Sequence, residues 1–83
     1  MQKILVTVDE ASELTSLGTQ KIRELIKSGI IVPITNGNKQ VIPVYELDKF
    51  ARDYIGLAIG TTEEMLLAKQ EVERKRKWAN QRN

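Results

Sequence analysis

Residue types that usually carry out catalysis are scarce in this chain of 83 residues. It contains no histidine and no cysteine, so the common general bases, nucleophiles and metal-ligand sets are missing. Carboxylate pairs occur at residues 9–10, 63–64 and 71/73, and each is better explained by a helix N-terminus or a solvated helix face. The glycines stand singly and form no phosphate-binding loop. We therefore expect no enzyme, no cofactor, no metal site and no small-molecule ligand.

A second group of polar side chains, in the stretch LGTQKIRELIKS (residues 17–28), could recognise a nucleic acid. Gln can pair with adenine, and Arg or Lys with guanine, in the major groove of DNA, while Lys also contacts phosphate. The alternative is a solvated helix face whose charges merely stabilise the helix. Taken alone, the stretch favours this alternative. The side chains concerned are Gln20, Glu24 and Lys27, opposite the apolar face, with Lys21 and Arg23 on its flanks.

The apolar residues of this stretch predict a short helix. Ile22, Leu25 and Ile26 recur at i, i+3 and i+4, which gives one narrow apolar face. Gly18 precedes the helix at a tight turn, and Gly29 follows it where a left-handed C-cap is wanted.

The preceding residues predict a partner helix. Thr7 and Glu10 have the spacing of a capping box, so a helix is expected from about residue 8 to residue 15, with Ala11 and Leu14 facing inward. Residues 16–18 then form a turn, and two short helices joined by a tight turn are a helix-turn-helix arrangement. The short β-prone run before Thr7 is expected to add to another strand.

A hairpin is expected after this pair of helices. Asn36 and Gly37 stand between β-prone runs and predict a type I′ turn, with positive φ at both central residues. The polar tip carries Lys39. Pro43 ends the hairpin where a third helix, about residues 44–55, can begin.

The remaining residues predict a connector and a long helix. Leu57 and Ile59 lie in a glycine-bounded connector and are expected to pack on the domain. A second capping box at residues 61–64 opens a helix that runs to about residue 79. This helix carries the basic run 74–77 and a thin apolar stripe of Met65, Ala68, Val72 and Ala79.

The net charge of +2 is unevenly distributed. Residues 1–60 contain seven basic and seven acidic side chains, whereas residues 61–83 contain six and four, so the excess lies in the tail. Within the first part, an acidic segment at residues 9–13 precedes a mostly basic block at residues 21–39. Such separation of acidic from basic residues along the chain points to an anionic partner.

Together these motifs resemble those of the small excisionase-type winged helix-turn-helix proteins, whose architecture is shared by the DNA-binding part of mercury-resistance-type regulators. The resemblance covers about 50 of the 83 residues and is greatest to excisionases of Gram-positive conjugative transposons. It is carried by TVDEAS (7–12), IREL (22–25), Gly29, Pro33 and IPVYELDKF (42–50), together with the NGN tip of the hairpin.

The resemblance implies that the second helix enters the major groove and that the hairpin, or wing, contacts the adjacent minor groove or backbone. Glu24 departs from the family pattern, because relatives often have Arg there, and a carboxylate repels phosphate unless it accepts from a cytosine amine. The basic helix after Gly60 also lies outside the pattern. Carried over by position, the DNA-facing residues are Thr19, Gln20, Lys21, Arg23, Lys27, Asn38 and Lys39.

The expected fold is α+β and mainly α: a winged helix-turn-helix with a two- to three-stranded antiparallel wing (residues 1–60) and an extra basic helix or tail (residues 61–83). The expected function is sequence-specific binding of double-stranded DNA by a phage or mobile-element excisionase, or recombination directionality factor. An integrase, or further copies of the chain, would bind through residues 61–79. The alternatives are a small transcriptional regulator and a phage packaging or assembly adaptor. With no signal peptide or membrane span, the expected location is the cytoplasm of a bacterial host cell.

Overall fold

A computed structural model describes residues 3–81, and the side-chain surroundings of residues 3–78. The chain divides into two compact units, the first ending at Arg52 and the second beginning at Asp53. Each unit is described by itself.

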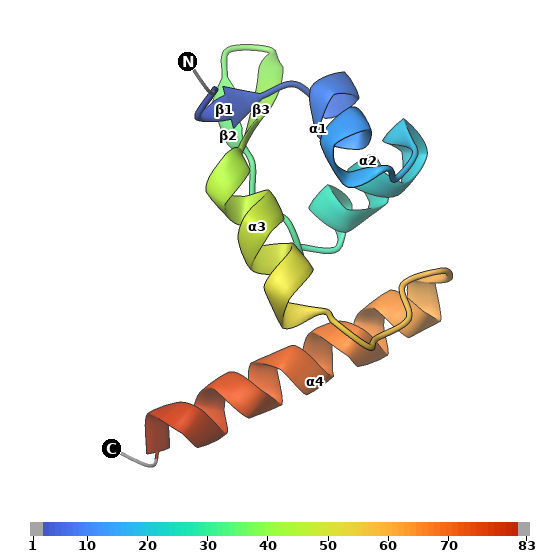
Figure 1. The fold of residues 1–83 in the computed structure, drawn as a ribbon, viewed down its shortest axis with the longest axis vertical. Coiled ribbons are helices and arrows are strands. Elements are labelled where there is room, and N and C mark those ends of the chain that lie inside the picture. The colour runs from blue at the N-terminus through green and yellow to red at the C-terminus, as the bar shows by residue number, and fades with distance from the viewer. Residues whose placement is uncertain (1–2, 82–83) are drawn as a thin grey trace. The chain divides into compact units, whose positions relative to one another are not determined.

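The first unit has six elements (Figure 1). In chain order they are β1 (Leu5–Val6), α1 (Val8–Thr15), α2 (Thr19–Lys27), β2 (Ile34–Asn36), β3 (Lys39–Pro43) and α3 (Val44–Asp53), whose last residue begins the second unit.

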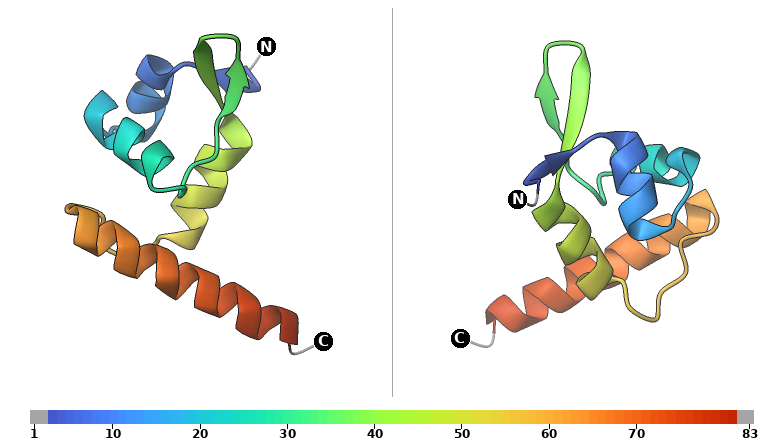
Figure 2. Two further views of the ribbon diagram at one scale, coloured as in Figure 1. Left: turned by 180° about the vertical axis from the view of Figure 1, so that it is seen from behind. Right: turned by 45° about the horizontal axis from the view of Figure 1, so that its top comes forward.

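The three strands form an antiparallel sheet in the order β1-β3-β2. In the β1 pairing Val6 lies opposite Ile42, and the amide of Val44 continues it by donating to the carbonyl of Ile4 at 2.8 Å. The early β-prone run therefore does add to another strand, as predicted. Helix α1 contacts β1, β3 and α2 and lies between the sheet and α2 (Figures 1 and 2). This is a mainly helical winged helix-turn-helix, followed by an extra helix.

The core of the first unit is small and wholly apolar. Among the described residues no buried side chain is polar or charged. Burying a large aliphatic side chain stabilises the folded state by about 1.5–3 kcal/mol, so a small number of buried residues accounts for the hydrophobic stabilisation of this unit. They are Val6, Ala11, Ile22, Leu25, Ile31, Ile42 and Leu47.

Both predicted capping boxes are present. At α1 the amide of Glu10 donates to Thr7 Oγ1 at 3.1 Å, and the amide of Thr7 donates to Glu10 Oε1 at 3.0 Å. The same pair of bonds, at the same distances, joins Thr61 and Glu64 at the start of α4 (Thr62–Gln81). Each box satisfies two amides that a helix N-terminus leaves without partners.

The turn between α1 and α2 is fixed by hydroxyl groups. Ser12 Oγ donates to the carbonyl of Leu17, and the amide of Leu17 donates to Thr15 Oγ1 at 3.3 Å. Ser16 has φ 63°, in the left-handed region, whereas Gly18 has an ordinary φ of −68° and is the N-cap of α2. The left-handed residue of this turn is thus Ser16 and not Gly18. The hydrogen bonds of the Ser12 and Thr15 hydroxyls hold the chain in this conformation.

Leu14 does not face inward as predicted, since its side chain is 63% exposed. The inward face of α1 consists of Val8, Ala11, Ser12 and Thr15, while Glu10, also half-buried, lies on another side of the helix. At about 100° per residue, Leu14 lies roughly a third of a turn away from the centre of that face.

The predicted hairpin forms, but the predicted type I′ turn is wrong. Asn36 pairs with Lys39, so the central turn residues are Gly37 and Asn38. Gly37 has φ 64°, while Asn38 is not among the described residues with positive φ. Positive φ at the first central position alone, with glycine there, is typical of a type II′ turn.

The second unit contains the end of α3, a connector and α4. Helix α3 ends at Asp53, earlier than predicted, and Gly56 with φ 84° turns the chain. Leu57 and Ile59 are half-buried. Met65, Ala68 and Val72 of the predicted stripe are buried, whereas the side chain of Ala79 lies outside the described residues.

The capping box at α1 gives a stability prediction. We expect Thr7→Ala to lower the free energy of unfolding by about 1 kcal/mol, because the amide of Glu10 loses its partner. Thr7→Ser keeps the hydroxyl and is the matched control, with a much smaller change. Urea unfolding measures both variants, and an equal loss in the two would mean that the hydroxyl does not stabilise the helix.

Candidate nucleic-acid interface

Helix α2 is attached by one apolar face. Ile22 and Leu25 are fully buried and Ile26 is half-buried, so the predicted face is confirmed. A helix of nine residues is too short to be stable alone. Its attachment to α1 therefore determines which residues face outward.

The C-terminus of α2 is closed by a Schellman motif. Gly29, with φ 81°, donates its amide to the carbonyl of Ile26 at 3.1 Å, and the amide of Ile30 donates to the carbonyl of Leu25 at 3.0 Å. The predicted left-handed cap at Gly29 is thus confirmed. The N-cap, Gly18, makes no side-chain cap bond.

Five of the seven predicted DNA-facing residues lie together on α2. Gln20, Arg23 and Lys27 are exposed, and Thr19 and Lys21 are half-buried at its margin. Neither Arg23 nor Lys27 makes an ion pair within the described part of the chain. Two cations are therefore available on this surface.

Glu24 lies on the same surface with its own cationic partner. Lys21 Nζ contacts Glu24 Oε1 at 2.8 Å. This hydrogen bond is the main cause of a pKa of Glu24 below its ordinary value of 4.5, and a hydrogen bond from Gln20 acts in the same direction. At neutral pH the carboxylate is ionised and is balanced by Lys21.

The other two predicted residues, Asn38 and Lys39, lie at the hairpin turn. Both are exposed, as is every residue of β2. The hairpin projects from the body of the first unit (Figure 2). The structure therefore collects the predicted residues into two groups, one on α2 and one at the wing tip.

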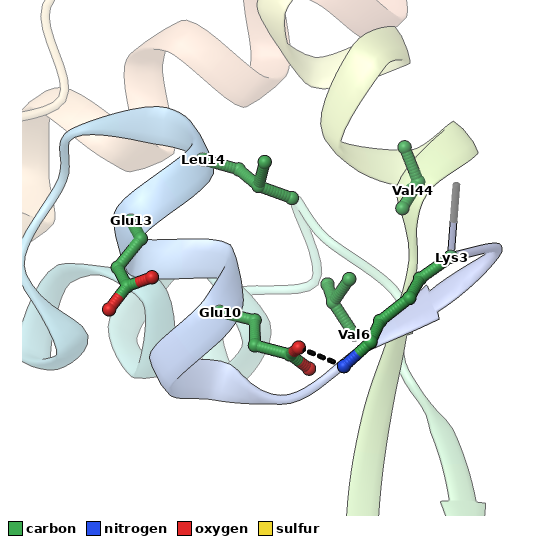
Figure 3. Close-up of a pocket in the computed structure, with 6 residues that line it drawn as sticks. All are labelled: Lys3, Val6, Glu10, Glu13, Leu14 and Val44. Atoms are coloured by element: carbon green, nitrogen blue, oxygen red, sulfur yellow. Dashed lines mark hydrogen bonds and ion pairs between the residues drawn. The ribbon is translucent and has the colours of Figure 1, made fainter. Parts of the chain in front are cut away.

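The motifs did not reveal a pocket of about 490 Å³ beside β1 and α1. Leu14 points across it towards Val6 and Val44 (Figure 3). Lys3 forms an ion pair with Glu10 at its edge, which, with the amide of Thr7, holds the pKa of Glu10 below 4.5. Both oxygens of Glu10 are thus engaged. Lys3 precedes β1 and Glu10 lies in α1, so the two belong to no common periodic pattern and the sequence does not predict their pairing.

The family model for the helix-turn-helix domain matches residues 5–54, more than half of the chain. The chain belongs to this family. The match includes α1, α2 and the wing, and it supports sequence-specific DNA binding by this helix-turn-helix protein. No curated protein and no solved structure matches the chain.

Helix-turn-helix domains are DNA-binding modules and are typically not enzymes. Within residues 3–81, no group of three or more Asp or Glu residues could hold a metal ion. No helix in that part of the chain is long and apolar enough to cross a membrane.

The Lys21–Glu24 pair gives a binding prediction. We expect Glu24→Gln to tighten binding to duplex DNA, because it removes a negative charge from the outward surface of α2 and with it the carboxylate that Lys21 contacts. The slope of log K against log[salt] should steepen by about one, the value for one further phosphate contact. Because the pKa of Glu24 lies below 4.5, the effect should be constant between about pH 6 and 8.

The matched control for this measurement is Glu13→Gln. Glu13 is an exposed carboxylate on α1 that lines the pocket beside β1, and its change alters the net charge equally. Fluorescence anisotropy with a labelled duplex measures both variants. Weaker binding by the Glu24 variant would show instead that the carboxylate reads a base.

Proposed function

We propose that the chain is an excisionase-type DNA-binding protein of a phage or mobile element, acting in the bacterial cytoplasm. It binds and bends DNA at an attachment site and directs an integrase towards excision. The likeness of the motifs in residues 7–50 to excisionases supports this role. The single observation that carries DNA contact is the outward surface of α2, where Arg23 and Lys27 stand exposed above a fully buried apolar face.

In the proposed complex α2 lies in the major groove. Arg23 reaches the edge of a guanine, and Gln20 is suited to an adenine. Lys27 contacts phosphate, which positions the protein without reading sequence. The charge of Lys21 is balanced by the carboxylate of Glu24, so Lys21 attracts phosphate less strongly than Lys27 does.

The hairpin supplies the second contact. Asn38 and Lys39, at the end of a projecting wing, reach the adjacent backbone or minor groove. In this proposal Thr19, in the first turn of α2, contacts phosphate together with the helix N-terminus.

Helix α4 is assigned to protein contacts, with an integrase or further copies of the chain. Leu66, Leu67 and Trp78 on this helix are 55%, 61% and 60% exposed. Leu67 and Trp78 lie on the same side of the helix, and exposed apolar side chains on one side of a helix favour contact with a partner protein.

Arg23 gives the test of the proposed function. We expect Arg23→Ala to weaken binding to the preferred duplex by about 1–3 kcal/mol and to reduce discrimination between sequences, as loss of a bidentate base contact does. Lys27→Ala should weaken binding to all sequences alike and reduce the salt slope by about one.

Arg52→Ala is the matched control. Arg52 is an exposed cation at the last turn of α3, paired with Asp48 at 3.0 Å. Its loss changes the net charge equally and should leave affinity nearly unchanged. Equal effects of the Arg23 and Arg52 variants would contradict the assignment of α2, and no DNA binding at low salt would favour an adaptor that acts through protein contacts.

A further inference from the structure

Helix α4 carries a second stripe of four residues, distinct from the apolar stripe of Met65, Ala68, Val72 and Ala79. Its members, hereafter the outer stripe, are Leu67, Glu71, Arg74 and Trp78. Their spacing of four, three and four residues places them within about 60° of one another around the helix. The stripe is about 16 Å long at 1.5 Å per residue.

The opposite side of α4 is already engaged. Met65 and Val72 are buried, and Arg76 forms an ion pair with Asp53 at the start of the same unit. These three helix positions lie roughly 140–180° from Leu67. The outer stripe lies on the other side of the helix, where Leu67 and Trp78 are 61% and 60% exposed.

The outer stripe is symmetric in its chemistry. Its midpoint falls between residues 72 and 73, and Leu67 and Trp78 are equally far from that point. Glu71 and Arg74 are also equally far from it, on opposite sides. One half is thus an apolar residue followed by an acid, and the other half is a base followed by an apolar residue.

We propose that the outer stripe is a self-association surface, on which a second copy of the chain docks as an antiparallel α4–α4 pair. A twofold axis at the midpoint places Leu67 of one copy against Trp78 of the other, and Glu71 against Arg74. Such an interface is isologous and closed, so it forms dimers, not chains. A parallel pair would place like charges together at both central positions, which is unfavourable.

The shape of the surface agrees with this arrangement. One hollow of about 330 Å³ is lined by Leu57, Ala58, Glu64, Leu67, Ala68 and Glu71. A second hollow of about 330 Å³ is lined by Arg74, Lys75 and Trp78. The twofold axis places the hollow beside Trp78 of one copy opposite the hollow beside Leu67 of the other, so the Trp78 indole of each copy meets the apolar hollow of its partner.

The charges at the midpoint can interact both within one copy and between the two copies. Within one copy, Arg74 Nη2 contacts both Glu71 oxygens, at 2.6 and 2.7 Å. In the dimer two such pairs lie side by side and form a network of four alternating charges, which is worth more than separate exposed pairs. A contact confined to a stripe about 16 Å long is smaller than the roughly 1,200–2,000 Å² of a stable complex, so we expect weak association, in roughly the micromolar to millimolar range.

The inference rests on the proposed function in one respect, the assignment of α4 to protein contacts. The experiment is done without DNA, so that failure of DNA recognition by α2 and failure of the dimer are distinguishable. Sedimentation velocity of the full chain, up to about 1 mM, measures association of the wild type and of the variants E71R and R74E.

Each charge reversal should weaken self-association at least about tenfold, because all four central charges become alike. A mixture of the E71R and R74E chains should associate again, since each then faces its opposite. E73R is the matched control, because it reverses a charge outside the outer stripe, and it should associate like the wild type. Circular dichroism of each variant checks that the helices are retained.

Cross-linking tests the register and covers the case in which a reversal unfolds the helix. The chain has no cysteine, so L67C and W78C can each carry one thiol. With a short bis-maleimide, the mixture should cross-link, while each variant alone should not, because its two thiols lie about 16 Å apart along the axis. A monomeric wild type, dimers of the E71R chain as tight as the wild type, or no cross-link in the mixture would each overturn the proposal.

Discussion

Burial of Ile22 and Leu25 is the interaction on which the rest of the recognition surface depends. Helix α2 has nine residues and no side-chain N-cap, so it does not persist without the residues that it buries. Because the helix turns once every 3.6 residues, fixing these two side chains fixes the direction of Arg23 and Lys27. The core of the first unit thus also fixes the direction in which the two cations point.

The ends of α2 restrict its rotation further. Hydroxyl bonds from Ser12 and Thr15 hold the preceding turn, and the Schellman motif at Gly29 closes the other end. The helix is therefore held at its face and at both ends, which limits the entropy lost when it meets DNA.

The ion pair of Lys21 with Glu24 leaves a modest positive charge on the surface of α2, so one copy would make few phosphate contacts. Linking two copies through α4 would raise the effective concentration of the second.

Much of the fold could be predicted from the sequence, because its strongest signals are local. The capping boxes at Thr7 and Thr61, and the left-handed cap at Gly29, depend on residues within one helical turn. The bounds of α1 and the existence of the wing follow in the same way. The family match over residues 5–54 agrees with these elements.

The remaining features depend on choices that local patterns do not determine. Asn36 and Gly37 predicted one register of the turn, but pairing of Asn36 with Lys39 moves the turn by one residue. Leu14 has the residue type and spacing of a core residue, yet Ala11 is the buried residue of α1 and Leu14 is left 63% exposed. At the candidate interface, the types of side chain could be predicted, whereas the pairing of Glu24 with Lys21 required the structure.

The central claim is that α2 and the wing together form the DNA-contacting surface, and it can be mapped directly. Amide chemical shifts of the ¹⁵N-labelled chain would be followed by NMR during titration with a DNA duplex at low salt. We expect the largest changes in residues 18–28 and 36–40, with few in α3. Changes confined to α4, or none in α2, would contradict the claim.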